Sequence, residues 1–387
     1  MELEPTAQQR EFRERICALL CSEEVRAEVA AVRGARGVEP GLLDVYRRLG
    51  ERGWLAVNWP EEYGGLGGTI QDKAILTEEL IAHGVPDIVH TLSIDIVGLA
   101  LMMYGTDSQK RRLLPRIARG EGAASILFSE PAVGSDLASL GTRAEPDGDG
   151  WRIHGRKVYS MKSHLADFAL CAARTSESEV KYHGITLFVV PLKTPGVLVD
   201  PLWNLGDERF GDVTLTGIRV TEDDVVGEVD GGWEVINSVL GLERTGVEFE
   251  AKACRWFDVL LRHAADTGLL DHPVHGPRLV ELDSWVRAAR LLAWRSVTEL
   301  GEDASDDVHN AMSKLITSEV AQDVAQAQLD LTGLDGVLAR HDEGAVTEGT
   351  EGVAEAAYRE AVGLTLASGT SEVMRSLIAS TGLGLLA

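Results

Sequence analysis

The order of the hydrophobic patterns along the chain restricts its fold more than any single motif does. Apolar residues follow helical spacing through the first third, form short β-like runs after about Gly122, and return to helical spacing near Gly232. No long helical stretch separates the β-like runs, so the pattern argues against a parallel βαβ sheet. We therefore expect an α+β multidomain protein with an N-terminal α-helical domain (1–122), a central antiparallel β-sandwich or barrel (123–230) and a C-terminal helical bundle (231–387).

Local signals place individual elements within these domains. Thr6 with Gln9 and Thr106 with Gln109 resemble capping boxes, which predict two helix N-termini. The Asp-Gly-Asp-Gly run at 147–150 predicts a turn before a strand. The predicted strands are 151–160, 168–175, 184–192 and 212–221, and the predicted helical stretches are 233–265, 277–300 and 306–332, with a shorter helix from Thr370.

Charge and composition argue against several classes of protein. The 387 residues carry a formal net charge of -24, whereas non-specific binding to nucleic acid needs a basic surface. No apolar run reaches the roughly 18 residues that span a membrane. The polar, acidic start of the chain predicts no secretory signal. We therefore expect a cytoplasmic protein that binds neither nucleic acid nor membrane.

The cysteines and histidines do not predict a metal site. Cys17 and Cys21 are one helical turn apart, but the sequence offers no second ligand pair beside them, and reduced cysteines packed in cores are the favoured interpretation. His272 and His275 have metal-like spacing, but Pro273 lies between them and no further ligand cluster is evident. We interpret that segment as an exposed loop.

One ten-residue segment, 127–136 (LFSEPAVGSD), joins a hydrophobic run to a polar, glycine-bent loop. Ser129 and Ser135 provide hydroxyl groups near Gly134, whose missing side chain lets a backbone approach a ligand closely. Pro131 stiffens the turn. Such a loop suits the edge of a planar cofactor with a polar tail. A plain connection between a strand and a loop explains the same residues, and both interpretations stay open at this point.

Six segments together carry a resemblance to a known family. They are WPEEYGG (59–65), GTDSQKRRLLP (105–115), SEPAVGSDL (129–137), HGRKVYS (154–160), LGLER (240–244) and SGTSEVMR (368–375). In this order they resemble the motifs of the acyl-CoA dehydrogenase family, and the resemblance covers nearly the full length of the chain. It implies FAD as cofactor, a three-domain α–β–α subunit, and oxidation of an acyl-CoA thioester to its trans-2-enoyl product.

The resemblance also implies a catalytic base, which removes the α-proton while a β-hydride goes to flavin N5. Many family members have a glutamate directly before the Gly-Thr-Ser of the C-terminal motif, where this chain has Ser368. The branch that includes isovaleryl-CoA-type enzymes instead uses the glutamate of an "ER" pair, here Glu243-Arg244. Glu243 is thus the candidate base and Arg244 a candidate substrate-binding residue. Glu250 is the alternative base, and an ordinary surface Glu–Arg pair is the structural alternative.

Further site residues follow from the same resemblance. Phe128 and Ser129 would line the edge of the flavin ring. Ser135 would lie near the flavin or near the phosphopantetheine of the substrate. The substrate-binding role of Ser368 rests on its backbone N–H, which would polarise the thioester carbonyl.

Two more segments complete the implied cofactor site. Tyr159, Ser160 and Met161 occupy the family's Trp-Ile-Thr/Ser segment, where Tyr159 can stack on the ring face and Met161 offers only its backbone N–H to flavin N5. Thr370 and Glu372 begin a predicted helix whose backbone N–H groups suit a phosphate. A plain N-cap by Thr370 is the alternative.

One family segment is missing, which leaves the partners open. The Arg-x-x-Phe-Gly segment that reaches the FAD across a subunit interface has no counterpart in 262–279. The expected partners are an acyl-CoA or acyl-carrier thioester, an electron-transfer flavoprotein, and further copies of the chain in a homodimer or homotetramer. Two alternatives stay open: a flavin oxidase or monooxygenase on the same fold, and a subunit of a heteromeric acyl-CoA dehydrogenase with an incomplete flavin site.

Overall fold

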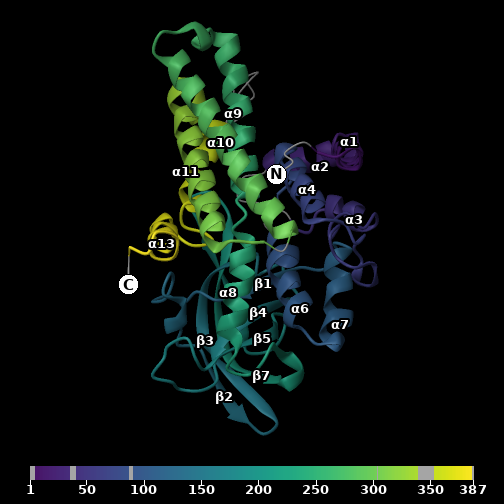
Figure 1. Ribbon diagram of the computed structural model, residues 1–387. Helices are drawn as coiled ribbons and strands as arrows, with labels where there is room; N and C mark the ends of the chain where they lie inside the picture. Colours follow the sequence, from purple (N-terminus) through teal and green to yellow (C-terminus); the bar gives the residue numbers. More distant parts are fainter. Residues whose placement is uncertain (1–4, 35–40, 87–89, 303, 339–352, 386–387) are drawn as a thin grey trace. The chain divides into compact units, whose positions relative to one another are not determined.

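A computed structural model describes residues 5–34, 41–86, 90–302, 304–338 and 353–385 (Figure 1). The chain folds into two compact units, and each unit is assembled from segments that are distant in sequence. The first unit comprises Met1–Val38, Thr69–Pro86 and Arg244–Ala387, and the second comprises Glu39–Gly68 and Asp87–Glu243.

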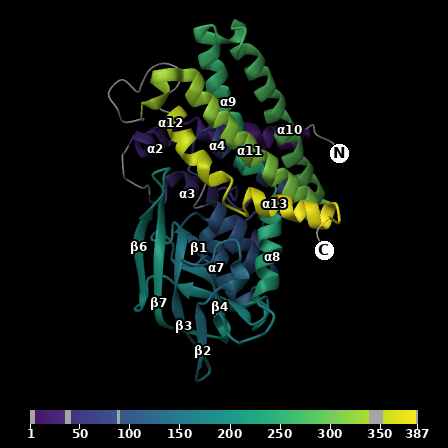
Figure 2. The same cartoon turned by 90° about the vertical axis from the view of Figure 1, so that its left-hand side faces the viewer.

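The first unit is helical throughout its described residues. Its elements are α1 (Ala7–Leu20), α2 (Glu23–Gly34), α4 (Ile70–Ala82), α9 (Val247–Thr267), η5 (Leu269–Asp271), α10 (His275–Gly301), α11 (Asp307–Thr332), η6 (Gly333–Val337), α12 (Val353–Leu364), α13 (Ser371–Leu377) and η7 (Ile378–Gly382). The long helices α9, α10 and α11 run side by side in Figure 1, and α12 packs along α11 in Figure 2. Trp256, Leu282 and Val324 are buried where these helices meet.

The predicted helical stretch 233–265 is wrong in one respect, because the structure divides it. Helix α8 (Gly232–Glu243) ends in the second unit, and α9 starts at Val247 in the first. Gly246 between them has a φ of 83°, a left-handed conformation that only glycine adopts without strain. A Cβ at this position would also lie 2.6 Å from Oγ of Ser313, so close packing against α11 excludes a side chain.

The second unit combines helices with a sheet. Its helical elements are α3 (Asp44–Gly50), η1 (Glu61–Tyr63), η2 (Thr91–Gly98), α6 (Leu99–Tyr104), α7 (Asp107–Ala118), η3 (Leu137–Ser139), η4 (Glu222–Asp224) and α8. Its strands are β1 (Ala124–Leu127), β2 (Arg143–Asp147), β3 (Gly150–Met161), β4 (Phe168–Arg174), β5 (Ile185–Pro191), β6 (Val197–Trp203), β7 (Arg209–Thr221) and β8 (Val225–Val226).

The sheet is mostly antiparallel, as the sequence predicts. Its strand order is β6-β7-β3-β2-β4-β5-β8, and β1 joins through β4. The pairs β1–β4 and β2–β4 are parallel, and the other neighbouring pairs are antiparallel. Asp147 pairs with Gly150 across the predicted turn between β2 and β3. Buried Leu127, Phe188 and Val213 belong to the hydrophobic core that holds the strands together.

Both predicted capping boxes are present. In α1 and in α7, the threonine oxygen accepts from the backbone N–H three residues on, and the glutamine side chain accepts from the threonine N–H at 2.9 Å. The predicted helix after Thr370 is α13, which Thr370 caps. Helix α12 and strands β2 and β6 have no counterpart among the predicted elements, because short or weakly periodic segments carry little signal.

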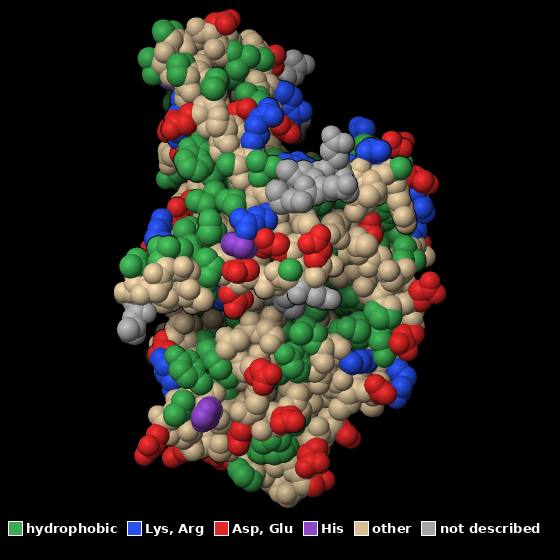
Figure 3. Space-filling view, in the orientation of Figure 1, with side chains coloured by type: hydrophobic (Ala, Val, Ile, Leu, Met, Phe, Trp, Pro, Cys, Tyr) green, Lys and Arg blue, Asp and Glu red, His purple; other side chains and the backbone are tan. Residues whose placement is uncertain are grey.

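The described surface carries charges of both signs. On the face seen in Figure 3, acidic side chains are scattered, and the Lys and Arg side chains lie singly or in small groups between them. Among the helices that the structure describes, none is long and apolar enough to cross a membrane.

Candidate functional site

A buried ion pair holds the polar loop after β1 against β3. The side chain of Lys157 is fully buried, and its ammonium donates to a carboxylate oxygen of Glu130 at 2.9 Å and to the backbone oxygen of Phe128 at 3.0 Å. The Glu130 carboxylate also accepts from the backbone N–H groups of Gly141 and Thr142, at 2.7 and 2.8 Å. One carboxylate therefore fixes both ends of the loop to the strand.

The same contacts set the charge of Glu130. Burial by itself would raise the pKa of this carboxyl group, but the attraction of Lys157 and the hydrogen bonds from Thr142 and Gly141 outweigh burial and lower the pKa. Glu130 is therefore ionised at neutral pH, and the pair with Lys157 stays charged.

The predicted flavin-edge residues lie beside the end of β3. Phe128 is buried and Ser129 is half-buried. The backbone N–H of Val158 donates to the Ser129 oxygen at 3.0 Å, which brings Ser129 next to Tyr159. Ser135, further along the loop, is exposed. The structure thus brings five of the predicted residues, Phe128, Ser129 and the 159–161 segment, together at the C-terminal end of β3.

The 159–161 segment has an unusual backbone. Tyr159 and Lys162 have positive φ values of 57° and 55°, and the pairing of β3 with β7 shifts register between Lys157 and Ser160. The Tyr159 side chain is 64% exposed, whereas Ser160 is buried and its Oγ has no hydrogen-bond partner among the described residues. The backbone oxygen of Met161 accepts from a serine of β1 at 2.7 Å. Left-handed conformations of non-glycine residues cost about 1–3 kcal/mol each and cluster at ligand sites.

The predicted residues of the C-terminal motif lie in the first unit. The Nε of Arg244 donates to the backbone oxygen of Ser368 at 3.2 Å. Ser368 and Gly369 both have positive φ, 55° and 96°, so they form a tight turn before α13. Thr370 accepts a backbone N–H as the N-cap, the alternative that the sequence left open. Glu372 lies in the first turn, where a backbone N–H and then the Thr370 hydroxyl lower its pKa.

Glu243 is the last residue of α8, in the second unit. Its side chain lies outside the described residues. The assignment of Glu243 as the base therefore stays a prediction.

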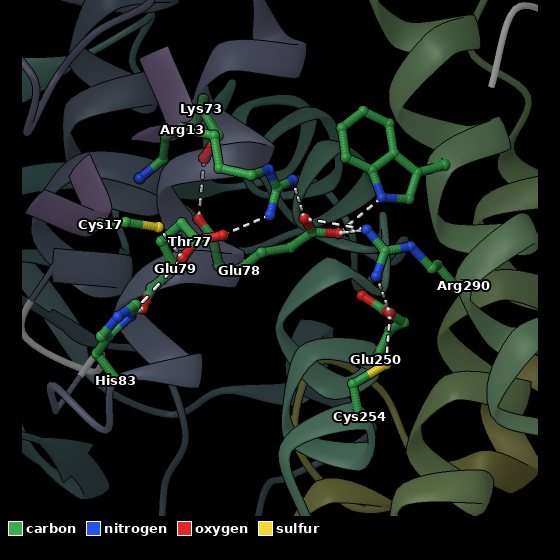
Figure 4. A network of polar contacts seen from close by, with 11 residues as sticks. Arg13, Cys17, Lys73, Thr77, Glu78, Glu79, His83, Glu250, Cys254 and Arg290 are labelled. Carbon is green, nitrogen blue, oxygen red and sulfur yellow. Dashed lines mark hydrogen bonds and ion pairs between the residues drawn. The ribbon is translucent and has the colours of Figure 1, made fainter. Parts of the chain in front are cut away.

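Glu250, the alternative base, lies in a buried polar network of the first unit (Figure 4). Its side chain is buried on α9, where one carboxylate oxygen accepts from the Cys254 thiol at 3.0 Å and lies 3.8 Å from Arg290. Arg290 and the indole N–H of Trp294 also bind Glu78 of α4, at 3.1 and 2.7 Å. The second oxygen of Glu250 has no hydrogen-bond partner among the described residues.

A cavity of about 660 Å³ borders this network, with Arg13, Glu78, Glu250 and Arg290 in its wall. Burial first, and repulsion from Glu78 second, raise the pKa of Glu250 to about 7. Glu250 therefore titrates near neutral pH.

Comparison with known proteins identifies the chain. Three family models match it in sequence: the acyl-CoA dehydrogenase N-terminal domain over residues 6–121, the middle domain over 125–217 and the C-terminal domain over 230–383. Acyl-CoA dehydrogenase FadE26 of Mycobacterium tuberculosis is 31% identical over 400 aligned residues, which cover 100% of this chain and 99% of that protein. The chain belongs to the acyl-CoA dehydrogenase family. Its members are oxidoreductases and depend on FAD.

Two solved structures of the family match the fold over the whole chain. The Tcur3481-Tcur3483 steroid ACAD has a TM-score of 0.89 and 31% sequence identity, with 100% of both chains covered. The ChsE4-ChsE5 complex from Mycobacterium tuberculosis has a TM-score of 0.87 and 28% identity, again with 100% of both chains covered. The three-part α–β–α organisation expected from the sequence is the fold of this family.

The residues of the second unit fit the family's flavin. The orphaned Oγ of buried Ser160 and the exposed ring of Tyr159, held in a left-handed conformation, provide an unused polar group and an apolar face at one edge. Phe128 and Ser129 lie beside them. An aromatic ring system with hydrogen-bonding edges matches this combination.

Lys157 and Glu130 are the functional candidates that sequence reasoning missed. They contact no predicted catalytic atom, but they fix Phe128 and Ser129 in place. A signal was present: counted by twos from buried Ile153, Lys157 falls on the inward face of its strand. A lysine there requires a buried anion as partner.

Replacing Lys157 should destabilise the protein much more than replacing a surface lysine. Lys157→Met leaves the Glu130 carboxylate without its cation, which should cost about 3–5 kcal/mol of unfolding free energy in urea titrations. The control is Lys193→Met, since Lys193 is exposed and its pair with Asp167 should contribute no more than about 1 kcal/mol. The double variant Glu130→Gln/Lys157→Met should recover part of the loss. Equal effects of Lys157→Met and Lys193→Met would contradict the role of the pair.

Glu250 should make stability fall as pH rises toward neutrality. Its pKa is about 7 in the folded protein and about 4.5 in the unfolded chain, so the folded state binds the proton more tightly, and this stabilisation is lost as pH rises through about 7. We compare the unfolding free energy of Glu250→Gln with that of the wild type at two pH values, by urea titration. The difference in favour of the variant should be about 3 kcal/mol larger at pH 8 than at pH 4.5. Exposed Glu302→Gln is the control. The same change at both pH values for Glu250→Gln would rule out the shifted pKa.

Proposed function

We propose that this protein is an FAD-dependent acyl-CoA dehydrogenase that converts an acyl-CoA thioester to its trans-2-enoyl-CoA. The observation that carries the proposal is the 159–161 segment, which combines a left-handed exposed tyrosine with a buried, unpartnered serine hydroxyl in a chain of this family. We further propose that the protein works in the cytoplasm and passes electrons to an electron-transfer flavoprotein. The domain ranges 1–122, 123–230 and 231–387 form part of the same proposal.

Residues of the second unit are proposed to hold the flavin. Phe128 and Ser129 line the ring edge, Tyr159 stacks on the ring face, and Ser160 and Met161 provide polar groups along the edge. Lys157 supports them by fixing the loop through Glu130. Ser135, on the exposed part of the loop, is proposed to contact the cofactor or the substrate.

Residues of the first unit are proposed to act on the substrate and on the polar end of the cofactor. Arg244 orders the turn at Ser368 through its bond to the Ser368 oxygen, and the Ser368 backbone N–H polarises the thioester carbonyl. Thr370 and Glu372 follow at the start of α13. The Thr370 hydroxyl oxygen already accepts a hydrogen bond from the backbone N–H of Val373. We therefore propose that Thr370 contributes to cofactor binding by ordering this turn.

The chemistry needs one base, and we propose Glu243. Its carboxylate takes the proton from the α-carbon while the developing enolate charge is stabilised at the thioester oxygen. Bound FAD supplies the acceptor for the hydride from the β-carbon. In this proposal Glu243 has the role that many family members give to a glutamate at the position of Ser368.

Glu243→Gln should keep FAD but lose the bleaching of the flavin by acyl-CoA. The purified variant is titrated anaerobically with a panel of straight-chain, branched and steroid acyl-CoA thioesters, and flavin absorbance is followed. Removing a general base typically lowers the rate by about 10²–10⁴-fold. Glu248→Gln, on the first turn of α9, is the control and should bleach like the wild type.

Two other results would overturn parts of this assignment. Bleaching lost in Glu250→Gln and retained in Glu243→Gln would make Glu250 the base. Rapid oxygen consumption by the wild type with acyl-CoA and no added acceptor would identify an oxidase instead of a dehydrogenase.

A second candidate function is that of one subunit in a heteromeric dehydrogenase. Two structures that match this chain over its full length carry paired names, the Tcur3481-Tcur3483 steroid ACAD and the ChsE4-ChsE5 complex. The absence of an Arg-x-x-Phe-Gly segment in 262–279 fits a chain whose flavin site is completed by an unlike partner.

Co-expression should distinguish the two assemblies. If an unlike subunit completes the site, the chain purified alone should hold less than one FAD per two chains, and co-expression with a family paralogue should restore stoichiometric flavin in a mixed complex. Flavin content and mass are measured by absorbance and light scattering. One FAD per chain in a homo-oligomer would contradict the heteromer.

A further inference from the structure

The ends of α1 and α4 bring two pairs of metal-binding side chains together. Cys17 lies in the last turn of α1 and Cys21 is the C-cap of that helix, while Glu79 lies in the last turn of α4 and His83 is its C-cap. Residues four apart lie on one face of a helix, so each helix presents two ligands in line. The Cys17 sulfur lies 2.9 Å from a Glu79 carboxylate oxygen, and the Cys21 sulfur lies 3.5 Å from Nε2 of His83.

This arrangement corrects the interpretation of the cysteines from the sequence. Cys17 is half-buried and Cys21 is exposed, so neither is packed in a core. The second ligand pair that the sequence did not reveal comes from α4, 62 residues away along the chain. Figure 4 shows the side chains of Cys17, Glu79 and His83 gathered in one place.

We propose that Cys17, Cys21, Glu79 and His83 bind one zinc ion. Two thiolates, an imidazole and a carboxylate form a mixed N/S/O ligand set that zinc binds tetrahedrally, at about 2.3 Å to sulfur and 2.0–2.1 Å to nitrogen. In such a site a sulfur and a nitrogen lie roughly 3.5 Å apart, close to the observed Cys21–His83 separation. Ligand atoms of Cys17, Glu79 and His83 already lie within 4.8 Å of one another.

The tautomer of His83 suits this role. Its Nδ1 lies 2.9 Å from the backbone oxygen of Glu79. A carbonyl oxygen can only accept, so Nδ1 carries the proton and Nε2, which faces Cys21, keeps its lone pair. A backbone carbonyl that fixes the second ring nitrogen is a common feature of metal-bound histidines.

The surrounding charges also suit a bound cation. Two thiolates and one carboxylate around a divalent ion leave a net charge of -1, and the Arg13 guanidinium, which pairs with the other Glu79 oxygen and also with Glu78, lies beside it. The two helices end at the same place and so direct the negative ends of their dipoles toward the site. Without an ion, the Cys17 thiol donates a hydrogen bond to Glu79, and binding of an ion would release the thiol proton to solvent.

The ion would tie the first helix of the chain to α4. A crosslink between Cys17 and Glu79 closes a chain loop of 62 residues, and closing a long loop restricts the unfolded chain. The exposed position of Cys21 leaves a path from solvent for the ion. The site is therefore proposed to stabilise the fold, and it needs neither flavin nor acyl-CoA.

Cobalt substitution tests the site directly. The reduced, chelator-treated full chain is titrated with Co²⁺, which in a tetrahedral thiolate site gives strong visible bands and sulfur-to-cobalt charge-transfer absorption. We expect saturation at one Co²⁺ per chain, displacement by Zn²⁺, and a higher melting temperature with either ion.

Three variants decide which residues bind the metal. Cys17→Ser/Cys21→Ser and His83→Gln should lose the cobalt bands and the metal-dependent rise in melting temperature. Cys254→Ser, which removes a thiol from the Glu250 network, should keep both. Circular dichroism and the metal-free melting temperature show that each variant is folded. Absent or weak octahedral bands in the wild type, or unchanged bands in Cys17→Ser/Cys21→Ser, would overturn the proposal.

Discussion

The Lys157–Glu130 ion pair is the interaction on which the loop after β1 and the end of β3 depend. A fully buried ammonium is tolerated because it meets a carboxylate and a backbone oxygen, and the carboxylate in turn accepts two backbone N–H groups. Every charged atom of the pair thus has partners, which is the condition for a buried ion pair to be stable. The loop after β1 is fixed by this pair, and the strained backbone at Tyr159 is held beside it.

Two buried carboxyl groups of the first unit, Glu78 and Glu250, differ in the number of partners that they have. The Glu78 carboxylate binds Arg290, Trp294 and Arg13, so its oxygens have cationic and N–H partners within the helix bundle. Burial first, and repulsion from Glu78 second, raise the pKa of Glu250 to about 7. Glu250 is thus a buried, titratable acid in this network, and it lies in the wall of the cavity at the border of the network.

Local sequence signals predicted much of this fold, because they depend on neighbouring residues alone. The capping boxes at Thr6 and Thr106 and the hairpin turn at 147–150 each involve a few consecutive residues, and the structure contains all three.

Contacts between remote residues could not be predicted in this way. The sequence did not reveal the division between α8 and α9 at Gly246, because the requirement for a glycine there comes from Ser313, 67 positions away on α11. The sequence also did not predict the Arg244–Ser368 hydrogen bond, the Lys157–Glu130 ion pair or the Cys17–Glu79–His83 cluster, because each joins residues that are far apart along the chain.

The sequence by itself determined the family, the order of helical and β regions, and the identity of the side chains available for chemistry. Six motifs in one order and the change of hydrophobic period are properties of the chain that need no coordinates. The tertiary structure alone decided the raised pKa of Glu250, the hydrogen bonds of Lys157 to Glu130 and to the Phe128 backbone oxygen, and the meeting of Cys17 and Cys21 with Glu79 and His83. These contacts and this pKa depend on distance and burial, which exist only after segments that are remote in sequence have packed together.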